Sequence, residues 1–556
     1  PSISLLSADL LLLHRSRSGS GSVPRIGSSA RRRLPLGGVQ RRRGSPRLGG
    51  GVGGSPHLLS PVASRPRLRP PRTGRRPCVR TSLSPPASAV PVGARPAAQG
   101  GRALAPPVVT MQPKHLWSLL FRILPKLLGL PASLLKKFRK EGLVELDIAM
   151  GTLPELPHDV LMNIFCTLEV PDLVRAGSVC SSWHAAYTCL RDLGKYKQSQ
   201  TPCLFYTSES AGDNVGFLYS LKENRSYKLT LPEPPIRSRF LIGSSNGWLI
   251  TADERSELHL VNPLTGEQVA LPSVMTIEHV KPIFDVSGAI HKYELSYDIW
   301  EVSLPPSLHD PSDLRECLYF KAFVFPDPST GSYIVVLIHN PNLQISFARP
   351  GDDKWTWVGQ GHFYKDCIYM DGLLYALNYF GEIDAFDLTA FPVKMTVIMD
   401  EMTYPICESM YIIQAPWGDL LQVSRTVEVL PNAPWYVPGS GNYRARTLKT
   451  KVCKVDLEAK QLMEINRLPC HILFLGHNNS LCLSAEGHPG LKSNHAYFTD
   501  DLKELTVEYK NSTRDMGVMD LENSVKKDIV SQIWSNWPCP TWITPNLMKL
   551  NLAFSK

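Results

Sequence analysis

Apolar residues between positions 157 and 190 recur with the spacing of α-helices. The first predicted helix carries one broad apolar stripe formed by Val160, Leu161, Ile164, Phe165 and Leu168. Pro171 and Asp172 suit the first turn of a second helix, and Gly177 and Ser178 end it before a third apolar stripe over 179–190. Because a unit of about 40 residues cannot bury so much apolar surface by itself, we expect part of it to meet a partner.

After about Thr201 the pattern changes to strands and tight turns. Residues 240–242 and 248–250 flank Asn246-Gly247, a strong hairpin signal, and two further strands are predicted at 258–261 and 268–271. The same pattern of strands and turns recurs at irregular intervals along the chain. Four-stranded sheets that repeat about every 40 to 60 residues are typical of a β-propeller. This repetition predicts an all-β propeller of undetermined blade number, with one degenerate repeat between Ile283 and Phe325.

The helical unit resembles the F-box. The order and spacing of Leu156-Pro157, Ile164, Leu173, Val179-Cys180 and Trp183 carry this resemblance. It implies docking on the Skp-type adaptor of an SCF-type ubiquitin ligase, and through the adaptor an association with cullin and RING subunits. The residues expected to bind the adaptor are Leu156, Pro157, Val160, Ile164, Phe165, Leu173, Val179, Cys180 and Trp183. For Phe165 and Trp183 the alternative is a place in the core of the three helices.

The strand-rich region resembles the KIB-type β-propeller, a domain of unknown function found behind F-boxes in many plant proteins. The segments that carry the likeness include "GSSNGWLI", "LVNPLTGEQVALP", "KDCIYMDGLLYAL" and the closing "PTWITP". The two resemblances together imply a plant F-box protein that acts as a substrate-recognition subunit. In that role the F-box docks on the adaptor, and the propeller binds a target protein for ubiquitination without an active site of its own.

One loop is a candidate surface for that target. The segment "PNAPWYVPGSGNYR" (431–444) contains Pro and Gly, which oppose regular structure, and we expect its aromatic residues to be exposed. Aromatic residues and Arg are favoured at the energetic centres of interfaces, and functional residues often lie on loops of rigid scaffolds. The candidate target-binding residues are Trp435, Tyr436, Tyr443 and Arg444.

Residues 1–110 differ in composition from the rest of the chain. They contain nineteen Arg, no Lys and a single acidic residue, Asp9, among Gly, Ser and Pro, and we expect them to be a disordered tail. Without this tail the chain has 41 basic and 49 acidic residues, a net charge of −8 instead of +10. Three readings fit this tail: an artefact of an over-extended gene model, an organellar targeting segment or a nucleic-acid-binding arm. Of these we favour the first, so we expect no nucleic acid as a partner.

The expected domain order continues from this tail. Residues 111–150 form a basic segment whose part 114–140 has seven basic residues and no acid, which suits packing on the next domain, membrane contact or organelle import. The F-box is expected at 151–195, the propeller at 203–546 and a C-terminal tail at 547–556. We expect the protein in the nucleus, the cytoplasm or both, with organellar targeting as the alternative.

The sequence offers little for catalysis or metal binding. It contains no Gly-rich phosphate loop, no GxSxG motif and no HExxH or CxxC pair among its twelve Cys. The adjacent pairs Asp352-Asp353 and Asp500-Asp501 are explained as turn residues. We therefore expect no cofactor, no metal and no enzymatic activity. The alternative is a propeller protein with a vestigial F-box, in an organelle or the cytosol, acting as a binding module or as a propeller hydrolase.

Overall fold

The computed structural model describes the chain from Leu156 onward, with a few short gaps. The described residues are 156–299, 302–327, 330–359, 363–400, 409–431, 443–529, 531 and 533–547. The predictions for 1–110 and 111–150, and those for Trp435 and Tyr436, lie outside the described residues. Within them, no helix is long and apolar enough to cross a membrane.

Three short helices form the predicted helical unit: α4 (His158–Phe165), α5 (Val170–Ala176) and α6 (Ser181–Asp192). Pro157 precedes α4, and Pro171 lies in the first turn of α5, where its missing N–H costs no hydrogen bond. Gly177, at the end of α5, allows Tyr187 of α6 to pack closely, because a Cβ at this position would lie 2.6 Å from Cγ of Tyr187. The predicted unit of three short helices is therefore confirmed.

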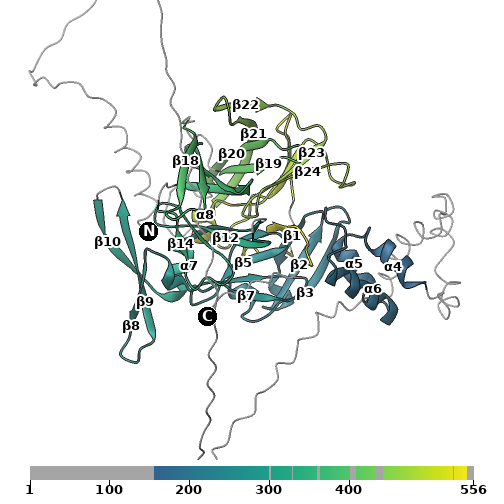
Figure 1. Ribbon diagram of the computed structural model, residues 1–556, viewed down its shortest axis with the longest axis horizontal. Coiled ribbons are helices and arrows are strands. Elements are labelled where there is room, and N and C mark those ends of the chain that lie inside the picture. Colours follow the sequence, from purple (N-terminus) through teal and green to yellow (C-terminus); the bar gives the residue numbers. More distant parts are fainter. Residues whose placement is uncertain are drawn as a thin grey trace, which may run out of the picture. The chain divides into compact units, whose positions relative to one another are not determined.

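Most of the remaining chain forms β-sheets whose strands pair mainly antiparallel (Figure 1). The sheet β28-β1-β2-β3 contains β1 (Cys203–Thr207), β2 (Val215–Ser220), β3 (Arg225–Thr230) and β28 (Thr541–Ile543). The second sheet contains β4 (Phe240–Ser245), β5 (Trp248–Ala252), β6 (Leu258–Val261) and β7 (Gln268–Ala270). The third contains β11 (Tyr319–Asp327), β12 (Ser332–His339), β13 (Gln344–Ala348) and β14 (Thr356–Trp357). The fourth contains β15 (Tyr364–Met370), β16 (Leu373–Asn378), β17 (Ile383–Asp387) and β18 (Lys394–Met399). The last two contain β19 (Ser409–Gln414), β20 (Leu420–Pro431), β21 (Tyr443–Asp456) and β22 (Gln461–Ile465); and β23 (His471–Leu475), β24 (Leu481–Ser484), β25 (His495–Phe498), β26 (Gly517–Asp520) and β27 (Lys526–Asp528).

These six sheets follow one another around a ring. Contacts join β28 to β4, β4 to β11, β11 to β15, β15 to β19 and β19 to β24. The ring closes because Leu204 and Trp542 of the first sheet pack in one core cluster with Ile472 and Phe474 of the last. The strand β28 also pairs with β1, so the two ends of the strand-rich region share one sheet. The predicted all-β propeller is confirmed, and the described residues give it six blades.

The region predicted to hide a degenerate blade folds differently. Strands β8 (Val280–Phe284), β9 (Ile290–Ile299) and β10 (Val302–His309) form a separate sheet of three strands. This sheet interrupts the connection from β7 to β11, while β4 and β11 still contact each other directly. It is therefore an insertion between two blades, and the prediction of a blade in this region was wrong.

Short helices fill connections around the ring. They are α7 (Pro311–Leu318), α8 (Lys503–Glu508) and the 3-10 turns η3 (Glu209–Ala211), η4 (Ile236–Ser238) and η5 (Val274–Thr276). The helix α8 packs Leu502 and Leu505 near its start against Val427 and Ala445 of the β20–β21 hairpin. Lys510, after α8, forms an ion pair with Glu316 of α7 at 2.6 Å.

The hairpin turns follow the predicted chemistry. Asn246 and Gly247 have φ angles of 49° and 85°, and Asp371 and Gly372 have 53° and 81°, the left-handed conformations that a two-residue turn of this type requires. At Gly247 a Cβ would also lie 2.9 Å from the backbone nitrogen of Asn546. The sequence thus encodes these turns locally. Because Gly247 has no side chain, the C-terminal segment at Asn546 can also pack closely against this turn.

The helical unit packs directly on the first blade. Phe205 and Leu218 of that blade belong to the same apolar cluster as the buried residues of α4–α6. Glu169, at the start of α5, accepts hydrogen bonds from Lys222 at 2.8 Å and from Thr201 at 3.0 Å. Leu547, expected in the C-terminal tail, is 1% exposed and lies in the same apolar cluster. The chain end thus contributes to the joint between the two domains.

Connectivity places this joint and the longest hairpin on opposite faces of the ring. In a four-stranded antiparallel blade, the first and third turns lie at one edge and the second turn lies at the other. Leu264, in the third turn of the β4–β7 blade, packs in the cluster with α4–α6. The paired ends of β20 and β21, at Pro431 and Tyr443, are the second-turn ends of their blade, and the β8–β10 insertion lies between two blades, so both belong to the opposite face.

Candidate functional site

Two surfaces of the molecule are candidates for binding, and the first lies on the helical unit. Pro157 and Cys180 are exposed, and four further predicted adaptor-binding residues are half-buried: Leu156, Val160, Ile164 and Val179. Val160 and Ile164 lie one turn apart on α4, so they share one side of that helix. These six residues, which we call the apolar rim, combine solvent access with apolar character.

Three predicted adaptor-binding residues lie inside the unit instead. Phe165 is 0%, Leu173 0% and Trp183 8% exposed. The rings of Phe165 and Trp183 meet edge to face, with centroids 5.3 Å apart. The structure therefore reassigns these three residues from the adaptor surface to the core, where they hold α4, α5 and α6 together.

A cleft of about 420 Å³ lies at the junction of the helical unit and the propeller. Val174, His184 and Tyr187 line one side of it, and Leu218 and Tyr227 line the other. The Arg175 guanidinium donates to Asp172 at 2.7 Å and lies 5.8 Å from the centroid of the Tyr227 ring. Cys180 of the apolar rim also lines this cleft, so the rim and the cleft are continuous.

The second candidate surface is the extended hairpin of β20 and β21. These strands have 12 and 14 residues, and their pairing continues to Pro431 and Tyr443. The hairpin therefore holds both ends of the segment 432–442, which contains the predicted contacts Trp435 and Tyr436. Arg444 is exposed, as a target-binding residue requires.

Tyr443 corrects the prediction for this loop. It is 4% exposed, and its hydroxyl donates to Asp500 Oδ2 at 2.9 Å. Strand alternation explains the difference, because Tyr443, Ala445 and Thr447 point inward while Arg444 and Arg446 point outward. Tyr443 is therefore a structural residue at the base of the hairpin.

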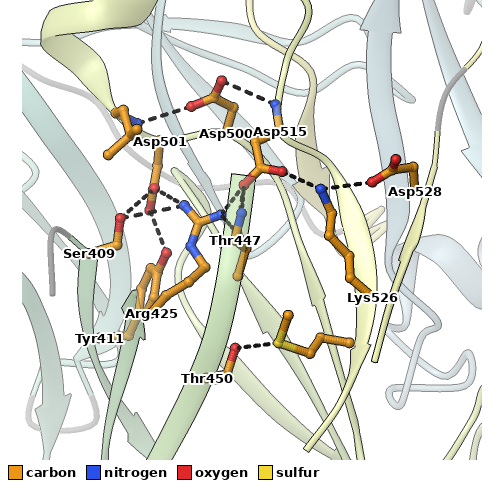
Figure 2. Close-up of polar contacts among 12 residues, drawn as sticks. Ser409, Tyr411, Arg425, Thr447, Thr450, Asp500, Asp501, Asp515, Lys526 and Asp528 are labelled. Atoms are coloured by element: carbon orange, nitrogen blue, oxygen red, sulfur yellow. Dashed lines mark hydrogen bonds and ion pairs between the residues drawn. The ribbon is translucent and has the colours of Figure 1, made fainter. Parts of the chain in front are cut away.

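A buried charge network supports this hairpin from inside (Figure 2). Arg425 of β20 pairs with Asp501, whose other oxygen accepts the Tyr411 hydroxyl at 2.7 Å. Burial alone would raise the pKa of Asp501, but Arg425 and its other partners offset this effect, so the pKa is lowered overall. Asp501 thus stays ionised and fixes β20 to the segment that precedes α8.

Asp515 and Asp500 continue the network to β21. Asp515 Oδ2 accepts from the backbone nitrogen of Thr447 at 2.8 Å, and its other oxygen pairs with Lys526 (Figure 2). Asp500 accepts from the backbone nitrogen of Asp515 at 3.2 Å in addition to Tyr443, and burial raises its pKa. Breaking such a pair leaves an uncompensated buried charge, so the network favours one fixed position of the hairpin.

A second buried ion pair lies where the first strands of the blades meet. Lys321 of β11 donates to Asp366 of β15 at 2.9 Å. The other oxygen of Asp366 accepts from the backbone nitrogen of Ile412 at 3.1 Å and from the Ser480 hydroxyl at 3.0 Å. These four residues come from four consecutive blades, and both carboxylate oxygens accept hydrogen bonds. Asp366 therefore ties the ring together, and its position offers no access to a substrate.

Sequence reasoning missed both networks. It explained Asp500 and Asp501 as turn residues and drew no conclusion from Arg425 or Lys321. Asp500 and Asp501 do follow strand β25, but neither is open to solvent. Asp500 is 1% exposed, and the side chain of Asp501 is 10% exposed. An Arg and a Lys at inward positions of otherwise apolar strands were the available signal, since charges there need partners.

The histidines near the C-terminal sheet have structural contacts. His488 forms hydrogen bonds with Ser199 and Thr201, His477 is half-buried, and His471 contacts the ring of Trp417. Over the described residues, no group of three or more His, Cys, Asp or Glu side chains is arranged to hold a metal ion.

Comparison with known proteins relates both domains to established families. The KIB1-4 beta-propeller model matches residues 218–520, and the F-box-like model matches residues 153–189. The F-box protein SKIP23 of Arabidopsis thaliana is 26% identical over 70% of this chain and 95% of its own length. The F-box protein KIB4 and the F-box only protein 7 of Arabidopsis thaliana are 28% and 27% identical, each over 42% of this chain. These two matches span 59% and 58% of the relatives' own lengths.

The matches agree with the architecture. The F-box-like match ends within α6, and the propeller match begins in β2 and ends with β26. The ring closes with β28, beyond the end of that match, which the pairing of β28 with β1 makes part of the same domain. The chain therefore belongs to the KIB1-4 beta-propeller family and carries an F-box-like domain ahead of its propeller.

Proposed function

We propose that this protein is the substrate-recognition subunit of an SCF-type ubiquitin ligase. The observation that carries the proposal is the apolar rim, which remains partly accessible although α4, α5 and α6 already pack in one apolar cluster with the first blade. In the proposed complex the rim docks on a Skp-type adaptor, which brings the cullin and RING subunits. Each apolar side chain buried there contributes roughly 1.5–3 kcal/mol before the cost of association.

The arrangement of the two domains supports this role. The helical unit packs on one face of the propeller, and the β20–β21 hairpin belongs to the other face. Lys222 and Glu169 connect the start of α5 to the first blade, so the joint is held by an ion pair as well as by apolar packing. A target held on the far face is thus kept at a fixed position relative to the adaptor. The proposed effect is proximity, which raises the effective concentration of the target near the ubiquitin-loaded enzyme.

The proposal assigns no catalytic step to this chain. The buried carboxylates Asp366, Asp500 and Asp501 are occupied by cations and hydrogen-bond donors. We further propose that the protein acts in the nucleus, the cytoplasm or both. Imaging of the full chain with a C-terminal fluorescent tag checks the location, and accumulation only in an organelle would contradict it.

Co-purification with a Skp-type adaptor tests the proposed function. The full chain should retain the adaptor, and the double variant Val160→Asp, Val179→Asp should lose it, because two charges then lie in the apolar rim. Val397→Asp, Val525→Asp is the matched control, since these valines are 44% and 56% exposed on the propeller. Circular dichroism checks that every variant is folded. A folded wild-type chain that fails to bind the adaptor would refute the proposal.

A further inference from the structure

The outward face of strand β21 carries a row of basic side chains. Arg444, Arg446, Lys449 and Lys451 are all exposed and all lie on the side of the strand opposite Tyr443, Ala445 and Thr450. A register shift between Thr426 and Val427 makes Leu448 an additional outward residue and keeps the row on one face. We call Arg444, Arg446 and Lys449 the basic strip, because Lys451 is engaged by Glu464 at 3.2 Å.

The strip has little compensation from its own fold. Within the described part of the chain, no ion pair involves Arg444, Arg446 or Lys449, and the acid nearest in register is Glu428, opposite Arg446. Leu430 and Leu448, 43% and 42% exposed, lie beside the basic residues. Exposed Leu side chains between Arg side chains resemble an interface more than a solvated charged surface, since Arg anchors interfaces and apolar neighbours exclude water.

The basic strip is also rigidly supported. Thr447, between Arg446 and Leu448, donates through both its backbone nitrogen and its hydroxyl to Asp515 (Figure 2). The backbone nitrogen of Tyr443 donates to Ser512 at 3.1 Å. Because both inward neighbours are fixed, the outward side chains leave the strand at fixed points. Preorganisation of this kind lowers the ordering cost when a partner binds.

We propose that the basic strip binds an extended acidic segment of the target protein, with Asp or Glu at alternate positions. Side chains on one face of a strand repeat about every 6.5–7 Å, so Arg444 and Arg446 match carboxylates two residues apart on a second extended chain. Each guanidinium can hold a carboxylate through two parallel hydrogen bonds. This inference rests on the proposed function, since it names the chemistry of the target that the propeller recognises.

Photocrosslinking to the full chain tests the proposal. The probe is a synthetic 12-residue peptide of alternating Glu and Thr with a benzophenone at its centre, and mass spectrometry locates the crosslinks. We expect crosslinks within 425–451, and at least a tenfold loss of them in Arg444→Gln, Arg446→Gln. The matched control Lys228→Gln, Lys354→Gln removes the same charge from exposed positions elsewhere and should keep them. Locating the crosslinks separates the strip from the Arg-rich segment 1–110.

Several outcomes would overturn the proposal. Crosslinks only within 1–110, or an equal loss in both double variants, would show a general charge effect. Crosslinks at the strip only with a peptide carrying phosphothreonine would replace carboxylate recognition by phosphate recognition. Adaptor co-purification of the same variants distinguishes failure of this inference from failure of the ligase role. A basic-strip variant that retains the adaptor but loses the peptide supports this inference. A chain that binds the peptide but no adaptor refutes only the ligase role.

Discussion

The helical unit and the β20–β21 hairpin both offer a surface to a partner, but the two surfaces are built in opposite ways. The helical unit exposes apolar side chains over an apolar core that includes Phe165 and Trp183. The hairpin exposes basic side chains over a buried network that includes Arg425 and Asp501. An apolar surface binds through area removed from water, whereas a charged surface gains from steering and geometry. The comparison teaches that the two surfaces should respond differently to charge, salt and pH.

Removal of the buried cation should have the largest effect. The Arg425→Leu variant leaves Asp501 buried without its guanidinium, which should lower the free energy of unfolding by about 3–5 kcal/mol. Urea denaturation measures the change. Arg444→Leu, on the outward face of the same hairpin, is the matched control and should change stability by less than about 0.5 kcal/mol. Equal losses in the two variants would show that the network does not support the hairpin.

A cavity in the helical core should come next. Phe165→Ala removes a fully buried ring that packs on Trp183 and should cost about 3–4 kcal/mol. Val160→Ala, in the same helix but half-buried, should cost less than about 1 kcal/mol and instead weaken adaptor binding. Thermal unfolding and adaptor titration separate the two effects. The assignment of Phe165 to the core fails if its variant unfolds like the wild type.

Acidification should destabilise the propeller through two histidines whose pKa the fold lowers. Burial lowers the pKa of His339 and that of His477 to about 4. The unfolded chain binds these protons near pH 6.5 and the folded chain only near pH 4, so stability falls as pH decreases across this window. Each group contributes about 2 kcal/mol of loss at pH 5.

The pH effect of one histidine can be isolated. Burial raises the pKa of Asp366 and of Asp500, which acts in the opposite direction at low pH, so the total slope mixes several groups. His339→Asn removes one titrating group, and denaturation from pH 7 to pH 5 should then show a loss smaller by about 2 kcal/mol than in the wild type. An unchanged difference would mean that His339 is protonated in the folded protein.

Salt should give the smallest effect and sharpen the comparison most directly. Raising NaCl from 50 to 300 mM should change adaptor binding by less than about twofold, because the apolar rim carries no charge. Capture of the acidic peptide at the basic strip should fall about tenfold over the same range, since exposed ion pairs are screened. Isothermal titration calorimetry at both salt concentrations measures the affinity for the adaptor, and the crosslink yield measures capture of the peptide. Equal salt dependence would show that the two surfaces do not differ as described.

The sequence predicted the elements whose signals are local. The stripe of Val160, Ile164 and Phe165 has the helical period, and Asn246-Gly247 needs left-handed φ angles, so neighbouring residues alone determine the helix and the turn. It could not distinguish Phe165, in the core, from Val160, at the rim, because both lie on one stripe and only packing against α6 separates them.

What the tertiary structure alone decided joins residues far apart in the chain. The pairing of β28 with β1 closes the ring, and Arg425 meets Asp501 across 76 positions. The insertion of β8–β10 outside the ring and the burial of Tyr443 also depend on neighbours that no local pattern names. Periodicity reports which side of an element is apolar, whereas the partner of a buried charge is set by which strands the closed ring brings together.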